Sequence, residues 1–207
     1  NVRQYVEDGG AVLVAAGPDF ASADSIYRSP LAEILPVSPT GRVRDELFLP
    51  EVTEIGQRHP VTEGFMPVID EDAAAEGAQP WGRWMRLIDV EATGGATVMS
   101  GVDERPLLVL DRIGEGRVAM LASDHAWLWS RGFEGGGPQL ELLRRLAHWM
   151  MKEPDLEEEA LSVTTEGQTM TITRRTLGEG VEDVEIEAPD GALTLVPLEE
   201  ASPGRFT

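Results

Sequence analysis

GRVAMLASDHAWLWSRGFEGGGPQLELLRRLAHWMMK, residues 116–152, is the stretch that decides the fold of this chain. It predicts a buried strand, a polar and aromatic turn, a glycine-rich loop and a long amphipathic helix. The strand is Arg117 to Ala122, a short apolar run that is typical of a sheet covered on both faces. Pro138 stands where the first turn of a helix tolerates proline. Helical spacing predicts a buried helix face made of Leu140, Leu143, Leu146, Ala147 and Met150.

Polar side chains follow this strand directly. Ser123, Asp124 and His125 stand at its carboxyl end, where open α/β sheets place their ligand crevice. The candidate crevice residues are Asp19, Ser123, Asp124, His125, Trp127, Trp129 and Arg131. Ser123 and His125 share a face of an extended strand, but Ser123 lacks the Gly-x-Ser-x-Gly setting of a nucleophile elbow. Asp124 is expected to cap or hydrogen-bond the following turn.

The aromatic residues of the turn have two interpretations. Trp127, Trp129 and Phe133 either form a stacking platform for a sugar or another ring-bearing ligand, or pack the loop onto the domain or an interface. We favour packing or an interface. Arg131 is expected over a tryptophan face or paired with Glu134.

Composition excludes several classes of function. The 207 residues include 37 acidic and 17 basic side chains, a net charge of −20, which argues against nucleic acid or an anionic membrane surface as a partner. The chain has no cysteine, so it has no disulfide, no thiolate metal site and no cysteine nucleophile. Asp124 and His125 lack an evident third ligand, so we predict neither a metal site nor a cofactor. No run reaches the roughly 20 apolar residues of a membrane span.

The order of predicted elements indicates a segment of a longer protein. A helix ending at Asp8 leads into the strand Ala11 to Ala16, as if an N-terminal strand were missing. Residues 38–85 are rich in proline, glycine and charge and are expected to be mostly loop. The next predicted strands are Arg86 to Ala92, Ala96 to Gly101 and Pro106 to Leu110, the last forming a hairpin with Arg117 to Ala122.

From Leu161 onward the hydrophobic pattern has a period of two residues. The predicted strands are Leu161 to Thr165, Thr169 to Arg174, Val181 to Glu187 and Ala192 to Val196. Residues 153–207 carry 14 acidic residues and 3 arginines, a net charge of −11. We expect an incomplete all-β, immunoglobulin-like sandwich whose open edges pair with other parts of the full-length chain, with a protein partner, or with a second copy in a homodimer.

Three sequence blocks carry a resemblance to a known family. VRQYVEDGGAVLVAAGPDF (2–20), RHPVTEGF (58–65) and residues 114–161 resemble the glutamine amidotransferase-like domain of large bacterial membrane proteins with an aerotolerance-type N-terminal transmembrane region. The resemblance implies a class I, flavodoxin-like, three-layer α/β sandwich over residues 1–153, followed by an acidic linker at 154–160 and a β segment at 161–207. It also implies a soluble segment, extracytoplasmic or periplasmic, of a membrane-anchored protein.

The residues depart from a working amidotransferase. Such an enzyme needs a cysteine on a sharp strand-to-helix turn and a histidine to deprotonate it. No cysteine exists here, and Trp127 stands two residues after His125, where the family usually places a glutamate. We therefore predict a module without catalytic residues that acts in protein–protein interaction or envelope-related assembly. The alternative is a degenerate hydrolase or a small-molecule binder that uses the crevice around Ser123 and His125.

Overall fold

A five-stranded mixed sheet forms the centre of the molecule. The computed structural model describes residues 2–65 and 81–207. The strand order is β1-β7-β6-β5-β3, and only the β1–β7 pair is parallel among these neighbours. The strands are β1 (Ala11–Ala15), β3 (Glu51–Val52), β5 (Ala96–Ser100), β6 (Pro106–Ile113) and β7 (Gly116–Leu121).

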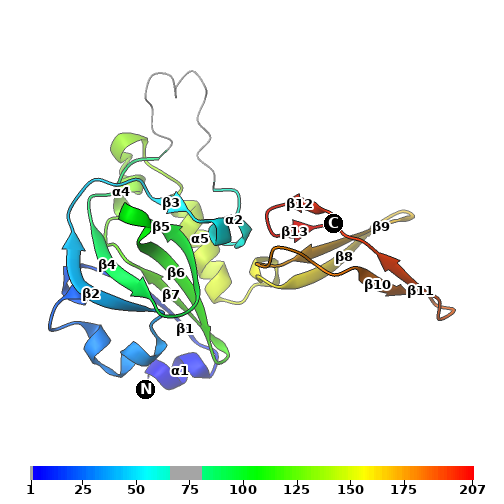
Figure 1. Cartoon of the computed structure of the whole chain (residues 1–207), viewed down its shortest axis with the longest axis horizontal. Helices are drawn as coiled ribbons and strands as arrows, with labels where there is room; N and C mark the ends of the chain where they lie inside the picture. Colours follow the sequence, from blue (N-terminus) through cyan, green and yellow to red (C-terminus); the bar gives the residue numbers. More distant parts are fainter. Residues whose placement is uncertain (1, 66–80) are drawn as a thin grey trace.

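Two different layers cover this sheet. Helix α5 (Gln139–Met150) packs along β7, and an antiparallel pair formed by β2 (Val37–Arg44) and β4 (Leu87–Ala92) packs against β6 from the other face (Figure 1). All six residues of β7 are buried, as the apolar run predicted. The remaining helices are short: α1 (Val2–Glu7), α2 (Glu54–Arg58) and α4 (Trp127–Ser130). The 3-10 turns are η1 (Pro18–Ala21), η2 (Ile26–Arg28), η3 (Pro30–Ile34), η4 (Val102–Glu104), η5 (Phe133–Gly135) and η6 (Pro154–Leu156).

The expected flavodoxin-like three-layer α/β sandwich is wrong. That fold requires parallel strands joined by helical crossovers with helices on both faces. Here most neighbouring strands of the central sheet are antiparallel, and a β ribbon takes the place of one helical layer. The described part of the chain is therefore dominated by β-structure.

The local elements were predicted more accurately than their arrangement. The β6–β7 hairpin and the strands β1, β4 and β5 lie where the sequence indicated. The expectation of loop over 38–85 is wrong for β2, whose pairing with β4 shifts register between Pro39 and Arg42. Proline and glycine in an edge strand with a bulge obscure its pattern. Residues 66–80 of that stretch lie outside the described residues.

The buried face of helix α5 matches the expected one only in part. Leu146 is buried as predicted, but the other buried residues are Leu142 and Trp149, whereas Leu140 is 82% exposed. The expected buried residues and the observed ones both recur at helical spacing, because apolar side chains occupy more than one side of this helix. The large ring of Trp149 decides between them, since it lies at 0% exposure against the sheet.

Residues 160–207, here called the tail, form two small sheets beside the main body (Figure 1). The first has the order β12-β13-β9-β8, and the second is the hairpin of β10 (Val184–Glu187) and β11 (Leu193–Val196). The strands of the first sheet are β8 (Ala160–Glu166), β9 (Thr169–Arg175), β12 (Glu200–Ser202) and β13 (Arg205–Phe206). Only Ile172 and Phe206 are buried hydrophobic residues of the tail, so the expected immunoglobulin-like sandwich, which needs a shared core, is wrong.

The packing of α2 on β5 gives a test of the fold. A Cβ atom on Gly56 would lie 2.0 Å from the carbonyl oxygen of Val98. Gly56→Ala is therefore expected to lower the free energy of unfolding by about 1–3 kcal/mol, as overpacking does. Gly180→Ala is the control, because a Cβ there meets no atom within 4 Å. Urea denaturation of the two variants measures the difference, and equal stabilities would contradict the packing described.

Candidate functional site

The predicted crevice lies where the parallel strands β1 and β7 end. Gly17 follows β1 and Asp124 follows β7, and a Cβ on Gly17 would lie 3.4 Å from a carboxylate oxygen of Asp124. The two strand ends are thus adjacent, as expected from a parallel pair. Asp19 belongs to η1 in the same loop, and its side chain is exposed.

Ser123 has a structural role in this arrangement. Its side chain is fully buried, and its hydroxyl donates a hydrogen bond to the carbonyl oxygen of Arg86 over 2.6 Å. The hydroxyl oxygen of Ser123 in turn accepts a hydrogen bond from the backbone N–H of His125 over 3.2 Å. The hydroxyl hydrogen therefore points to a carbonyl oxygen and not to an imidazole. Because a serine nucleophile needs a base at that position, no Ser123–His125 catalytic pair is formed.

Asp124 and His125 face each other at the rim of the crevice. The Nε2 atom of His125 lies 3.6 Å from Asp124 Oδ1, and the guanidinium of Arg86 lies 3.4 Å from Asp124 Oδ2. The Nδ1 atom of His125 is buried and has no hydrogen-bond partner among the described residues. Trp127 stands edge-on to the His125 ring, with 6.1 Å between ring centroids, and is 52% exposed. Trp127 and Asp124 are therefore the exposed side chains of this group, and His125 lies mostly buried between them.

Trp129 and Arg131 do not belong to this group. Trp129 is buried, donates its indole N–H to the carbonyl oxygen of Gly82 over 2.6 Å, and packs edge-on against Trp81 and Trp84. The packing interpretation thus describes Trp129, whereas Trp127 remains open to solvent. The expected pairing of Arg131 with Glu134 is absent from the described residues. Glu134 binds Arg83 instead, and hydrogen bonds from Arg83 lower the pKa of Glu134 to about 2.

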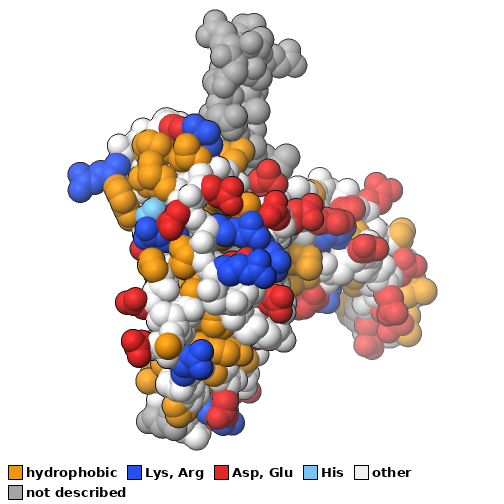
Figure 2. All heavy atoms as spheres, turned by 60° about the vertical axis from the view of Figure 1, so that its left-hand side comes forward, with side chains coloured by type: hydrophobic (Ala, Val, Ile, Leu, Met, Phe, Trp, Pro, Cys, Tyr) orange, Lys and Arg blue, Asp and Glu red, His pale blue; other side chains and the backbone are white. Residues whose placement is uncertain are grey.

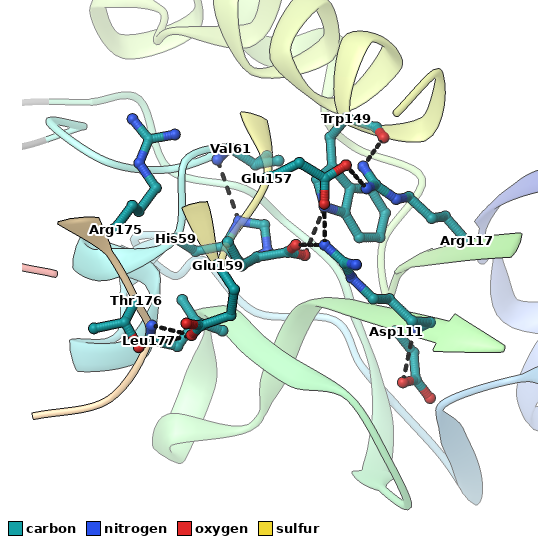
Figure 3. A network of polar contacts seen from close by, with 12 residues as sticks. His59, Val61, Asp111, Arg117, Trp149, Glu157, Glu159, Arg175, Thr176 and Leu177 are labelled. Carbon is teal, nitrogen blue, oxygen red and sulfur yellow. Dashed lines mark hydrogen bonds and ion pairs between the residues drawn. The ribbon is translucent and has the colours of Figure 1, made fainter. Parts of the chain in front are cut away.

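Sequence reasoning missed the densest polar cluster, which is centred on Glu158 and shown in Figure 3. One carboxylate oxygen of Glu158 accepts hydrogen bonds from the indole N–H of Trp149 over 2.7 Å and from His59 Nε2 over 3.2 Å. Its other oxygen is bound by the guanidinium of Arg112. Burial acts to raise the pKa of Glu158, but the hydrogen bonds from His59 and Arg112 outweigh it and hold that pKa well below its usual range.

His59 is held in its neutral form within this cluster. The backbone N–H of Val61 donates to His59 Nδ1 over 3.2 Å, so Nδ1 carries no hydrogen and Nε2 must carry it. Burial lowers the pKa of His59, although the hydrogen bond and charge of Glu158 oppose that effect. His59 thus bridges the loop after α2 to a carboxylate 99 residues away.

The neighbouring glutamates extend the cluster in two directions. Glu157 binds the buried guanidinium of Arg117, which also donates to the carbonyl oxygen of Trp149 at the end of α5. Glu159 points to the tail, where it accepts from the hydroxyl of Thr176 over 2.7 Å and from the backbone N–H of Leu177 over 3.1 Å (Figure 3). Residues expected to form an acidic linker therefore fasten the tail to the body. The signal in the sequence was the run Glu157-Glu158-Glu159, but its buried partners were not evident from spacing.

A cavity of 440 Å³ lies beside this cluster and is lined by His59, Asp111, Arg112, Glu158 and Glu159, among others. Burial raises the pKa of Asp111 there, although a hydrogen bond from the backbone N–H of Arg112 opposes the shift. Both carboxylate oxygens of Glu158 already accept hydrogen bonds within the protein. No group of three or more potential metal-ligating side chains occurs among residues 2–65 and 81–207.

Comparisons with known proteins identify relatives in fold only. Neither a protein-family model nor a curated protein sequence matches the chain. A cytoplasmic protein of Salmonella typhimurium matches the structure with a TM-score of 0.56 and 19% identity, covering 72% of this chain and 58% of the other. A cytoplasmic protein of Salmonella typhimurium LT2 matches with a TM-score of 0.54, 21% identity and the same coverages. The chain thus spans less than two thirds of the length of either protein.

A β-galactosidase from Rahnella sp. R3 also matches, with 13% identity over 99% of this chain and 29% of the enzyme. Its TM-score of 0.45 is too low to support any statement about activity. The structural neighbours are not glutamine amidotransferase-like domains, so the resemblance inferred from the three sequence blocks is wrong. They also give no support to a periplasmic, membrane-anchored setting. Within the described ranges, no helix has the length and apolar character that crossing a bilayer requires.

The neutral His59 predicts how stability depends on pH. The folded-state pKa of His59 is lower than its unfolded value of about 6.5. Its contribution to the free energy of unfolding is therefore fully present above about pH 6.5 and is lost as the pH falls, because the unfolded chain binds a proton that the folded chain does not. The slope from one such proton is about 1.4 kcal/mol per pH unit.

Urea denaturation at a series of pH values measures this slope. His59→Gln removes the titrating group and is expected to give a shallower dependence between about pH 5 and pH 6.5 than the wild type. The depressed pKa of Glu158 acts in the same direction but only below about pH 4.3, so the two contributions separate along the pH axis. Identical slopes for the two proteins would show that His59 is protonated in the folded state.

Proposed function

We propose that this chain is a protein-interaction module without catalytic residues and that its tail is the binding element. The observation that carries the proposal is the imbalance between buried and exposed apolar residues in the tail. Ile172 and Phe206 are buried, whereas five large hydrophobic residues are more than half exposed: Leu161, Val163, Met170, Leu193 and Leu195. A unit of this size with so small a core gains stability by covering such residues against a partner.

The edge strand β8 is the part of the tail best suited to pairing. It is the last strand of the order β12-β13-β9-β8, so one side of its backbone has no neighbouring strand in the described chain. Proteins commonly protect such edges with charges or proline. Residues 160–165 contain neither, although the surrounding tail is strongly acidic. An extended partner strand is the occupant that this edge fits.

A second copy of the chain satisfies this edge symmetrically. Two antiparallel β8 strands related by a two-fold axis would place Val163, the middle residue of the strand, opposite its own copy. The acidic charge of the two tails opposes this approach, as Figure 2 indicates by the many acidic side chains over the tail at the right. Added salt screens that repulsion, so self-association is expected to strengthen as ionic strength rises.

Sedimentation velocity over a range of protein concentrations tests this form of the proposal. Val163→Glu places two carboxylates face to face at the axis and is expected to weaken dimerisation by about tenfold or more. Leu140→Glu is the matched control, because Leu140 is an exposed apolar residue as well but lies on α5 in the body. A wild type that stays monomeric at high salt and high concentration would contradict pairing through β8.

A second candidate function rests on the crevice. His125 Nδ1 is a buried polar atom without a partner in the described chain, and such atoms are uncommon unless a ligand or water satisfies them. The exposed ring of Trp127 beside it offers a stacking surface. These two features favour a small ring-bearing molecule that supplies one hydrogen-bonding group.

Thermal unfolding in the presence of monosaccharides and aromatic carboxylates tests this candidate. A ligand is expected to raise the midpoint of the wild type, and His125→Ala is expected to abolish the rise because the polar partner is lost. Ser130→Ala is the control, since Ser130 is exposed and its hydroxyl contacts only the carbonyl oxygen of Trp127 among the described residues. A shift that persists in His125→Ala would place the binding elsewhere.

A further inference from the structure

A second cavity lies where the tail meets the body, and its lining is unusually rich in arginine. Its volume is 470 Å³. The charged side chains that line it are Arg144, Arg145, Arg175, Arg205, His148, Glu63, Glu153 and Asp155. The whole protein has a net charge of −20 and only 17 basic residues, so four arginines around one cavity run against its general composition. We call this space the junction cavity.

Three of these arginines converge on a single residue, Glu63. The guanidinium of Arg145 donates to the backbone carbonyl oxygen of Glu63 over 2.6 Å. Arg175 Nη2 lies 3.4 Å from one carboxylate oxygen of Glu63, and Arg205 Nε lies 4.0 Å from the other. The three arginines come from α5, β9 and β13, which are distant in sequence. Glu63 therefore contacts three guanidinium groups, two of them through its carboxylate and one through its backbone carbonyl oxygen.

Some of the guanidinium atoms at the junction cavity are also buried. The side chain of Arg175 is only 12% exposed, and burial together with the nearby Arg205 and Arg145 lowers its pKa, against the charges of Glu63 and Asp155. The Nε atom of Arg205 is buried and donates no hydrogen bond within the described residues. A buried donor without an acceptor is costly, and the Nε atom of Arg205 is such a donor among the described residues, although the Arg205 side chain as a whole is 44% exposed.

The side chains that surround the cavity are held in place before any ligand arrives. The guanidinium of Arg145 lies over the ring of Phe65, 4.5 Å from its centroid, and its Nε atom donates to Glu141 over 2.8 Å. Arg175 donates to the backbone carbonyl oxygen of Asp155 over 2.6 Å. Fixed guanidinium groups lose little conformational entropy on binding, which favours a small ligand.

We propose that the junction cavity binds a phosphate-type oxyanion, either free or as the phosphate group of a small molecule. Guanidinium groups bind tetrahedral oxyanions through paired N–H donors. Arg145, Arg175 and Arg205 present such donors at one place, where the anion takes the position of the Glu63 carboxylate beside Arg175 and Arg205. Bound there, the anion bridges α5 of the body to β9 and β13 of the tail. Glu63, Glu153 and Asp155 at the same cavity disfavour an extended polyanion such as nucleic acid.

Isothermal titration with inorganic phosphate tests the proposal, with ionic strength matched by sodium chloride. The wild type is expected to show saturable binding. Arg205→Gln is expected to weaken it by about tenfold or more, because a charge-assisted hydrogen bond is lost. Arg174→Gln is the matched control: Arg174 lies next to Arg175 on β9, but it binds Glu159 and lines a different cavity. Its affinity for phosphate is expected to stay at the wild-type value.

A variant with the opposite sign guards against loss of folding as an explanation. Glu63→Gln removes the carboxylate that competes for Arg175 and Arg205, so phosphate is expected to bind more tightly. Circular dichroism confirms that each variant is folded. The proposal is overturned if the wild type shows no saturable binding, or if neither Arg205→Gln nor Glu63→Gln changes the affinity. Equal affinity for acetate and phosphate would overturn the assignment to a doubly charged oxyanion.

Discussion

The buried carboxylate of Glu158 is the constraint on which the relation between body and tail depends. It stands two residues before the tail and accepts hydrogen bonds from an indole, an imidazole and a guanidinium that belong to three separate parts of the body. A buried carboxylate is tolerated only when its partners replace the water it has lost. The carboxylate of Glu158 thus fixes the position of each of these partners. Polar contacts, more than apolar packing, join the tail to the body.

This arrangement explains why the tail exposes so many apolar side chains. The glutamates at 157–159 and the arginines facing Glu63 join it to the body through directed hydrogen bonds and ion pairs. Such contacts fix orientation without covering much apolar surface. The strands of the tail therefore leave these hydrophobic residues exposed, and the acidic residues elsewhere in the tail limit which surfaces can approach them.

The sequence predicted local structure well and tertiary arrangement poorly, for identifiable reasons. The buried strand β7 and its hairpin with β6 follow from a continuous apolar run and a glycine-containing turn, which are short-range signals. The layers over the sheet depend on pairings such as β2 with β4, which join residues about 50 positions apart. The partly wrong prediction of the buried face of α5 has a similar cause. Apolar side chains at helical spacing lie on more than one side of this helix, and only the packing of Trp149 shows which side is buried.

The candidate site shows the same division between near and distant residues. Ser123, Asp124 and His125 lie together at the strand end as their spacing indicated, because they are neighbours in sequence. Trp129 lies apart from that group, because its indole N–H donates a hydrogen bond to the carbonyl oxygen of Gly82, 47 residues away. The acidic run 157–159 was evident in the sequence, but no local pattern indicated that Glu158 meets His59. Their meeting requires the body and the acidic run to be folded together first.

The acidic surface of the tail and its edge strand β8, which is uncharged over residues 160–165, have complementary effects on the proposed association. Like charges spread over the tail raise the free energy of every non-specific approach between copies at low ionic strength. Backbone pairing along β8 lowers it only when two strands align in register, because hydrogen bonds require that geometry. The repulsion acts in all orientations, whereas the attraction acts in one. Together they favour one pairing geometry of the exposed edge over all others. In the proposed dimer, the charge that weakens the contact would therefore also make the contact specific.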